Sequence, residues 1–144
     1  MVWGTLRDWM VGRVEGLSPT TQGEDVGLSF VHDPRATEPD QLGVRRFLVV
    51  HGGGTPVEVD SAGPQRQVKA VSILVGYRDL RDAAKLDQVL GEDADTITTA
   101  LLDTTQWTAS GLRFWLRNFT TQPIDHEDGA ALEVSFEAEY LPTS

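Results

Sequence analysis

The chain has 144 residues and a formal net charge of −10, from 22 acidic and 12 basic side chains. This length fits one domain, which we place at residues 1–144, and is enough to bury a core. The acidic balance disfavours specific nucleic-acid binding, because that binding draws most of its affinity from basic side chains that neutralise phosphates. The chain has no cysteine, which excludes a disulfide framework, a thiol nucleophile and a zinc knuckle.

No stretch of the sequence approaches the roughly 20 consecutive apolar residues that a bilayer-spanning helix needs. The first residues also lack the basic and then apolar order of a secretory signal. The lack of cysteine fits a protein that is made and folded in a reducing cytosol.

The first segment carries the apolar stripe of an amphipathic helix. Ser18 and Pro19 follow the stripe and end the predicted helix. Trp9 lies off the stripe, so it covers either a neighbouring element or another subunit. The stripe consists of Trp3, Leu6, Met10, Val14 and Leu17.

Residues 18–43 are rich in turn-forming residues and poor in periodicity. Only residues 26–32 alternate enough to predict a short strand. We expect the remainder to be a surface loop, and loops of this length are usually functional or mobile.

Two strands are predicted at residues 44–51 and 66–77, and the simplest pairing makes them an antiparallel hairpin. The second strand is apolar on both faces, which is typical of a central strand that is covered on each side. The connection between the strands contains the sequence HGGG. This motif is either an esterase-type oxyanion loop or the tip of a long β-hairpin.

The esterase interpretation is disfavoured because that motif works with a serine on a G-x-S-x-G turn, and the sequence has none. Three glycines at a strand end also tolerate positive φ and can begin a loop. A hairpin of this length would project about 25 Å at roughly 3.3 Å per residue. Such an arm has little core of its own, so we expect it to contact another chain through Gly52, Gly53, Gly54, Val57 and Val59.

Residues 79–103 predict a helical segment, with apolar residues at helical spacing from Ala83 to Leu101. Gly91 interrupts the pattern, and Asp93 can cap a new start. We therefore expect a short or kinked first part and a firm helix over 93–103.

The last third predicts two strands, at residues 111–119 and 131–141, joined by a turn at Asp128-Gly129. Arg113 and Arg117 can oppose the row of glutamates on the second strand and so help to fix its register. Trp115 shares the face of these arginines. It either lies under a loop or belongs to an interface, where tryptophan and arginine are enriched.

The sequence predicts no catalytic residue, cofactor or metal. The histidines, His32, His51 and His126, lack the spacing of metal ligands, so we interpret them as solvated turn residues. The many carboxylates show no pattern that places an acid–base pair in a pocket. The overall expectation is an α+β domain, with an antiparallel-rich sheet of about four to five strands, two main helices packed on one face, and a protruding β-hairpin arm.

Three patterns stand out in this layout. They are the V-x-I-x-V-x-Y strand at residues 71–77, the D-x-x-x-I-x-x-A-L helix from Asp93 to Leu101, and the E-x-x-F-x-x-x-Y strand from Glu133 to Tyr140. With the order of the elements, they resemble the tail terminator (tail-completion) family of long-tailed bacteriophages and gene transfer particles. The resemblance covers most of the chain, but residues 18–43 do not align.

The resemblance implies a homo-hexameric ring that caps the head-proximal end of a tail tube, stops tube polymerisation and joins the tail to the head. Its partners would be further copies of the chain, the tail tube protein and a head-side connector or stopper protein. DNA would pass through an acidic lumen without specific binding, and no membrane would be involved. The protein would be made in the bacterial host cytoplasm and reside in the neck region of the virion tail.

A ring of this kind needs two different contact patches on each subunit. The candidates are the predicted arm and the tryptophan and arginine residues, namely Trp9, Gly52, Gly53, Gly54, Val57, Val59, Arg113, Trp115 and Arg117. One alternative is another neck or head-completion subunit. A second is a monomeric α+β domain that binds or hydrolyses a ligand with His51 and the glycine loop.

Overall fold

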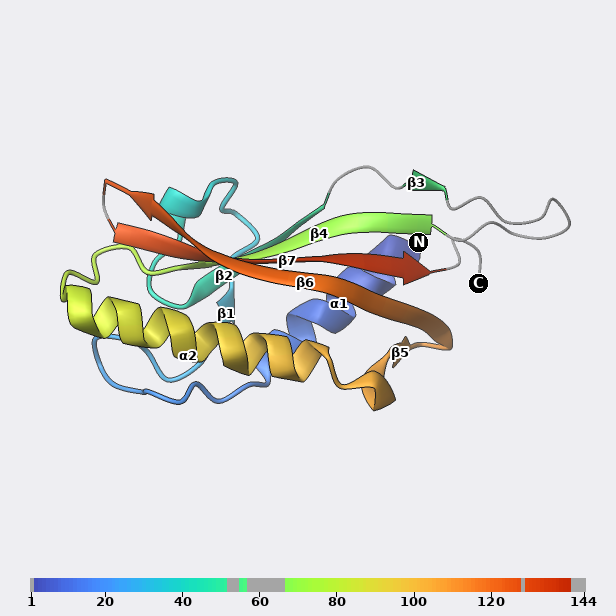
Figure 1. Cartoon of the computed structure of the whole chain (residues 1–144), viewed down its shortest axis with the longest axis horizontal. Coiled ribbons are helices and arrows are strands. Elements are labelled where there is room, and N and C mark those ends of the chain that lie inside the picture. Colours follow the sequence, from blue (N-terminus) through green and yellow to red (C-terminus); the bar gives the residue numbers. More distant parts are fainter. Residues whose placement is uncertain (1, 52–54, 57–66, 128, 141–144) are drawn as a thin grey trace, which may run out of the picture.

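The computed structural model describes residues 2–51, 55–56, 67–127 and 129–140. Two helices cover one face of a mixed sheet with strand order β1-β2-β4-β7-β6-β5, and β3 pairs with β4 (Figure 1). This arrangement confirms the α+β class. The sheet has seven strands, more than the four or five expected, because three strands have only two residues each, and β1 pairs with β2 in parallel.

The elements in chain order are α1 (Val2–Glu15), β1 (Val31–His32), the 3-10 turn η1 (Pro39–Gln41), β2 (Arg46–His51), β3 (Thr55–Pro56), β4 (Gln67–Gly76), α2 (Ala83–Leu101), the 3-10 turn η2 (Thr104–Gln106), β5 (Thr108–Ala109), β6 (Leu112–His126) and β7 (Gly129–Tyr140). None of the helices in the described ranges is long and apolar enough to cross a membrane.

Helix α1 forms where the apolar stripe predicts it, and the stripe faces the sheet. The first four residues of the stripe are buried, whereas Leu17 follows the helix and is half-buried. The carbonyl of Val14 accepts a hydrogen bond from the Leu17 N–H at 3.1 Å, which closes the helix end. The buried residues are Trp3, Leu6, Met10 and Val14.

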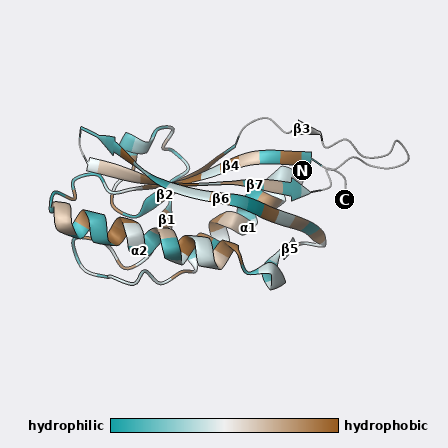
Figure 2. Cartoon of the chain, viewed as in Figure 1, coloured by the Kyte–Doolittle hydropathy of each residue, from teal (hydrophilic) through white to brown (hydrophobic). Residues whose placement is uncertain are grey.

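Helix α2 is one continuous helix, so the predicted interruption at Gly91 is wrong. It begins at the N-cap Asp82, whose side chain accepts a hydrogen bond from the Lys85 N–H at 3.2 Å. Hydrophilic and hydrophobic residues alternate around the helix (Figure 2). Burial of Val89, Ala94 and Ile97 against the sheet outweighs the cost of about 1 kcal/mol for one glycine.

The main core lies between the helices and the sheet, where β4 and β7 form the centre. Strand β4 pairs with β2 on one side and with β7 on the other, so the predicted β2–β4 hairpin is confirmed. The helix-facing residues of β4 and β7 are all buried, namely Val71, Ile73, Val75, Leu132, Val134, Phe136, Ala138 and Tyr140.

Among the described residues, cover on the opposite face of the sheet is found at one end. There Leu42, from the loop that follows η1, packs with Leu48 and Leu74 in a second small cluster. Gly76 permits this close approach, because a Cβ at that position would stand 2.2 Å from the Leu42 Cβ. The cover that was expected on both faces of β4 is therefore present at Leu74, whereas Ala70 on the same face is exposed.

The C-terminal hairpin is longer than predicted because β6 continues to His126. A β-bulge lies between Arg117 and Thr120, and Asn118 within it has a φ of 58°. Pro123 lies in the extended part of β6, opposite Leu132. A proline is tolerated there because, among the described strands, only the short β5 lies on the outer side of β6, so no ladder bond needs the missing N–H.

The loop between α1 and β2 forms less strand than predicted. Only Val31 and His32 of residues 26–32 are in a strand, next to β2. Gly27 has a φ of 79° and its N–H donates to the Gly23 carbonyl at 2.8 Å, so this part is a turn. The physical reason is a buried arginine, Arg45, whose side chain donates hydrogen bonds to backbone carbonyls of this loop.

Candidate assembly surfaces

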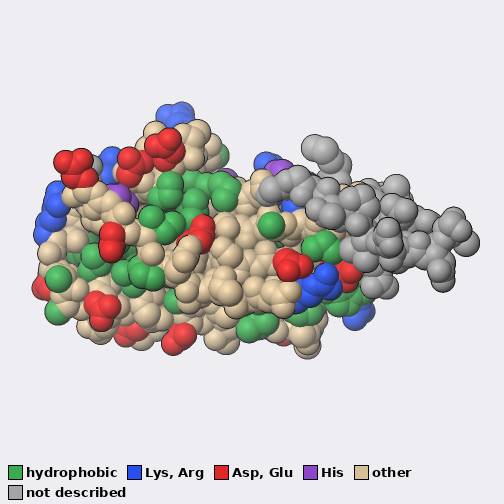
Figure 3. Space-filling view, turned by 45° about the horizontal axis from the view of Figure 1, so that its top comes forward, with side chains coloured by type: hydrophobic (Ala, Val, Ile, Leu, Met, Phe, Trp, Pro, Cys, Tyr) green, Lys and Arg blue, Asp and Glu red, His purple; other side chains and the backbone are tan. Residues whose placement is uncertain are grey.

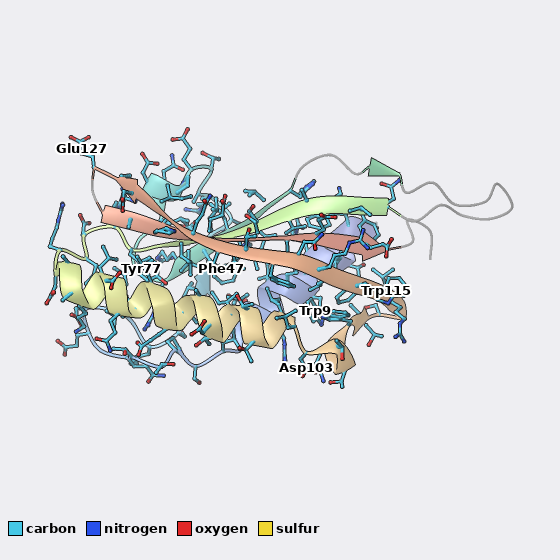
Figure 4. The ribbon with its side chains drawn as sticks, viewed as in Figure 1. Trp9, Phe47, Tyr77, Asp103, Trp115 and Glu127 are labelled. Carbon is cyan, nitrogen blue, oxygen red and sulfur yellow. The ribbon has the colours of Figure 1, made fainter. Side chains whose placement is uncertain are left out.

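A fully buried arginine lies between the loop, the sheet and α2. The Arg45 guanidinium donates two hydrogen bonds of 2.9 Å to the two carboxylate oxygens of Asp93, and neither residue is exposed. Tyr77 donates its hydroxyl to the same carboxylate at 2.5 Å and lies between α2 and the sheet (Figure 4). This bidentate arrangement is the geometry in which an arginine and a carboxylate bind most strongly.

The same arginine fixes the loop of residues 18–30. Its Nη1 donates to the carbonyls of Thr21 and Gly27, the latter at 3.3 Å. The backbone of Arg45 has a φ of 56°, a left-handed conformation that is uncommon outside glycine. It is held there because the Arg45 N–H donates to Gly76 at 2.8 Å and its carbonyl accepts from Val31 at 3.0 Å.

The buried network shows that the prediction for Asp93 is wrong. Asp93 does not cap a helix start but lies inside α2 and binds Arg45 from 48 positions earlier in the chain. Burial, followed by the negative charge of Asp93, raises the pKa of Tyr77 well above its usual value of 10.0. Each residue of the network has a hydrogen-bond partner within the protein. We therefore interpret the network as one that stabilises the fold.

The outer face of the C-terminal hairpin carries a row of charged residues. Arg117 lies opposite Glu137 and forms ion pairs with Glu137 at 3.6 Å and Glu139 at 3.4 Å. Asn118 donates to the Glu137 carboxylate at 2.9 Å. The predicted pairing of this arginine with the glutamate row is therefore confirmed, and the helix-free face of the sheet is polar here.

Trp115 shares this face and is half-buried (Figure 4). The Arg113 guanidinium lies 5.8 Å from the centre of its ring, within the range of a cation–π contact. The ring thus has a charged neighbour of its own subunit. Its assignment to an interface between subunits stays a prediction.

The other tryptophans of interest pack inside the subunit. Trp9 is half-buried and contacts Phe114 of its own chain edge to face, with ring centres 4.7 Å apart (Figure 4), and its assignment to an interface between subunits stays a prediction. Trp107 donates its indole N–H to the Leu101 carbonyl at 2.7 Å and so satisfies the end of α2. Close by, a hydrogen bond from the Thr105 hydroxyl lowers the pKa of Asp103, and its backbone N–H and the charge of Arg13 act in the same direction.

Most of the predicted arm, with Gly52, Gly53, Gly54, Val57 and Val59, lies outside the described residues. The described flanks pair as a hairpin, since Thr55 lies opposite Val68 in the β3–β4 ladder. His51, the first residue of HGGG, contacts the Trp3 ring at 4.4 Å and lies 3.3 Å from Lys69 through its Nδ1. Nothing in these contacts assembles a nucleophile or an oxyanion site around His51.

Within the described residues, no three His, Asp or Glu side chains lie together in a way that could hold a metal ion. His32 lies in β1 and His126 at the end of β6, so both belong to strands and not to the turns that were expected. The face in Figure 3 shows acidic and basic side chains interspersed, with no broad basic field.

Two surface features lie at opposite edges of the sheet. The first is a groove of about 590 Å³ between α2 and β6, which we call the α2–β6 groove. Its lining includes the apolar Leu86, Leu90, Ala94, Pro123 and Leu132. The second is the surface of β1 and β2, which we call the β1–β2 edge and which carries exposed Val31, Arg46 and Val50. The sequence pattern alone did not reveal either surface, because both depend on strands that are neighbours only in the fold.

No protein-family model matches the sequence, and no curated protein matches it. Among solved structures, a chain described as "Virion of native gene transfer agent (GTA) particle" aligns over 97% of this chain and 97% of its own length, with a TM-score of 0.56 and 16% identity. This protein shares the fold of that virion chain. A second solved chain aligns over 99% of this chain and 92% of its own length at 19% identity, but its TM-score of 0.43 carries no argument.

Proposed function

We propose that this chain is a structural subunit of a phage-type particle. In this proposal, six copies form a ring that caps the head-proximal end of the tail tube, stops tube polymerisation and joins the tail to the head-side connector. The observation that carries the proposal is the end-to-end likeness of fold, over 97% of both chains, to a chain from the virion of a gene transfer agent. The sequence patterns described above point to the same class of protein.

The charge of the subunit supports a passage for DNA. Its formal net charge is −10, and the half-buried Glu133 and Glu137 lie on the helix-free face of the sheet. An acidic surface repels the phosphate backbone, so DNA would slide past it without binding. The proposed partners are other copies of the chain, the tail tube protein and a connector or stopper protein on the head side, and its place is the neck of the virion tail.

The direct test is to add the purified chain to tail tubes that are growing from the tube protein of the same particle. The proposal expects tubes of finite length with a ring at one end, seen by electron microscopy. Tubes that continue to grow while the chain binds the head-side connector would instead identify a different neck subunit. A chain that binds neither partner would contradict the proposal.

A further inference from the structure

We infer that the β1–β2 edge of one copy docks into the α2–β6 groove of a second copy, head to tail. This inference rests on the proposed function, because it names the two surfaces through which the ring would close. A closed ring needs two different patches that meet each other, placed on different sides of the subunit. The two surfaces satisfy this requirement, since β1–β2 and β6 lie toward opposite edges of the sheet (Figure 1).

Both surfaces carry apolar side chains that would pack against each other. The groove presents the half-buried Leu86 and Leu90 and the exposed Pro123 along a depression of about 590 Å³. The β1–β2 edge presents Val31 and Val50, with 41% and 36% of their surface exposed. Apolar side chains of this kind gain free energy when they leave water, at about 25 cal/mol per Å² buried.

The charges around the apolar parts are also complementary. Asp87 and Asp125 line the groove and are exposed. Arg46 pairs in register with Val31, and Arg35 lies in the loop that follows β1. Among the described residues, none of these four charged side chains takes part in an ion pair, so each is available to a partner of opposite charge.

The contact runs through side chains and does not continue the β-sheet. Pro123 removes a backbone donor from the C-terminal part of β6, and the bulge between Arg117 and Thr120 twists the edge of that strand. Both features are devices that prevent strand edges from pairing between molecules. The groove beside Pro123 is therefore a site where side chains of the partner copy pack. The charged residues around it fix the orientation of that copy.

Charge reversal tests this inference. The groove variant carries Asp87→Lys and Asp125→Lys, and the edge variant carries Arg35→Asp and Arg46→Asp. Each variant alone sets like charges against each other at every contact, so we expect at least a tenfold rise in the concentration needed for the ring. The two variants mixed in equal amounts should recover the ring, because alternating copies again place opposite charges at each contact.

A matched control carries Glu24→Lys and Asp95→Lys, two exposed acidic positions that line neither surface. It has the same change in net charge as the groove variant and should form the ring like the unchanged chain. Circular dichroism of each variant shows whether it folds. The experiment is done where the unchanged chain forms its ring, either alone or on tube ends.

The outcomes separate the two proposals. If the unchanged chain forms a ring and the groove and edge variants do so equally well, the docking inference is overturned while the proposed function stands. If the variants lose the ring but the mixture does not recover it, the two surfaces do not contact each other. If the unchanged chain forms no ring even on tube ends, the proposed function fails, and the inference that rests on it fails too.

Discussion

Two arginine–carboxylate networks in this protein use the same chemistry in opposite environments. Arg45 is wholly buried and binds both oxygens of Asp93 at 2.9 Å. The Arg117 side chain is 44% exposed and lies 3.6 Å from Glu137, which is 39% exposed, and 3.4 Å from the more buried Glu139. The first network joins the loop, the sheet and α2, whereas the second lies on the outer face of the β6–β7 hairpin.

The difference teaches which network the fold depends on. A buried charge without its partner loses hydration and gains nothing in return, so breaking the Arg45 network leaves a large uncompensated cost. An exposed ion pair replaces contacts of its two charges with water by a contact within the protein, so it changes the free energy of folding little. Arg117 and Glu137, whose side chains are partly exposed, are therefore free to change for surface function, and the buried Arg45 network is not.

The largest expected effect follows from Asp93→Ala. This change leaves the Arg45 guanidinium and the Tyr77 hydroxyl buried without their acceptor, so we expect the free energy of unfolding to fall by about 3–5 kcal/mol. Urea unfolding at neutral pH measures the change. Asp95→Ala, on an exposed position of the same helix, is the matched control and should shift the free energy by less than about 0.5 kcal/mol. Equal effects at both positions would show that the buried network does not anchor the fold.

A smaller effect is expected from Tyr77→Phe, which removes one hydroxyl from the network. The carboxylate keeps its two bonds from Arg45, so the cost should be about 1–3 kcal/mol from the lost hydrogen bond. The measurement is again urea unfolding. A cost as large as that of Asp93→Ala would mean that Tyr77, and not Arg45, is the main partner of this carboxylate.

The contribution of Tyr77 should also depend on pH. Burial raises the pKa of Tyr77 in the folded state above the usual value of 10.0, so the folded state keeps its proton where the unfolded state has lost it. The unfolded state therefore gains stability as pH rises through about 10. We expect the stability advantage of the wild-type chain over Tyr77→Phe to be constant below about pH 9 and to shrink above about pH 10. An advantage that grows at the higher pH would contradict this sign.

The smallest effect is expected from Arg117→Ala on the exposed row. Because Arg117 and Glu137 are solvated, the free energy of unfolding should change by less than about 1 kcal/mol, and the change should shrink further in high salt. Thermal unfolding at low and high ionic strength measures both quantities. A loss above about 2 kcal/mol that ignores salt would remove the contrast between the two networks.

The sequence predicts the local elements well and the long-range pairs poorly. The stripe from Trp3 to Val14 and the alternation of β7 both report which face is buried, so α1 and the C-terminal hairpin follow from periodicity. The pairing of Arg45 with Asp93 does not, because the two residues are 48 positions apart. Asp93, two residues after Gly91, resembles a helix start locally, and only the buried arginine shows why the helix continues.

The candidate surfaces also differ in whether they depend on local patterns or on long-range contacts. Alternation along the sequence is enough to place Trp115 and Arg117 on one face of β6. The α2–β6 groove needs the position of α2 against the far part of β6, and the predicted strand ended at residue 119, before Pro123. A proline normally argues against a strand, so the extension becomes visible only when the open edge of β6 is seen.

The most direct test of the proposed ring is the mass of the purified chain in solution, measured by light scattering over a dilution series. A closed hexamer predicts a species of about six times 15.8 kDa at high concentration, with no species that grows without limit. Open chains of increasing mass would contradict ring closure. A chain that stays at 15.8 kDa at every concentration, and also in the presence of tail tube ends, would contradict the proposed function as a whole.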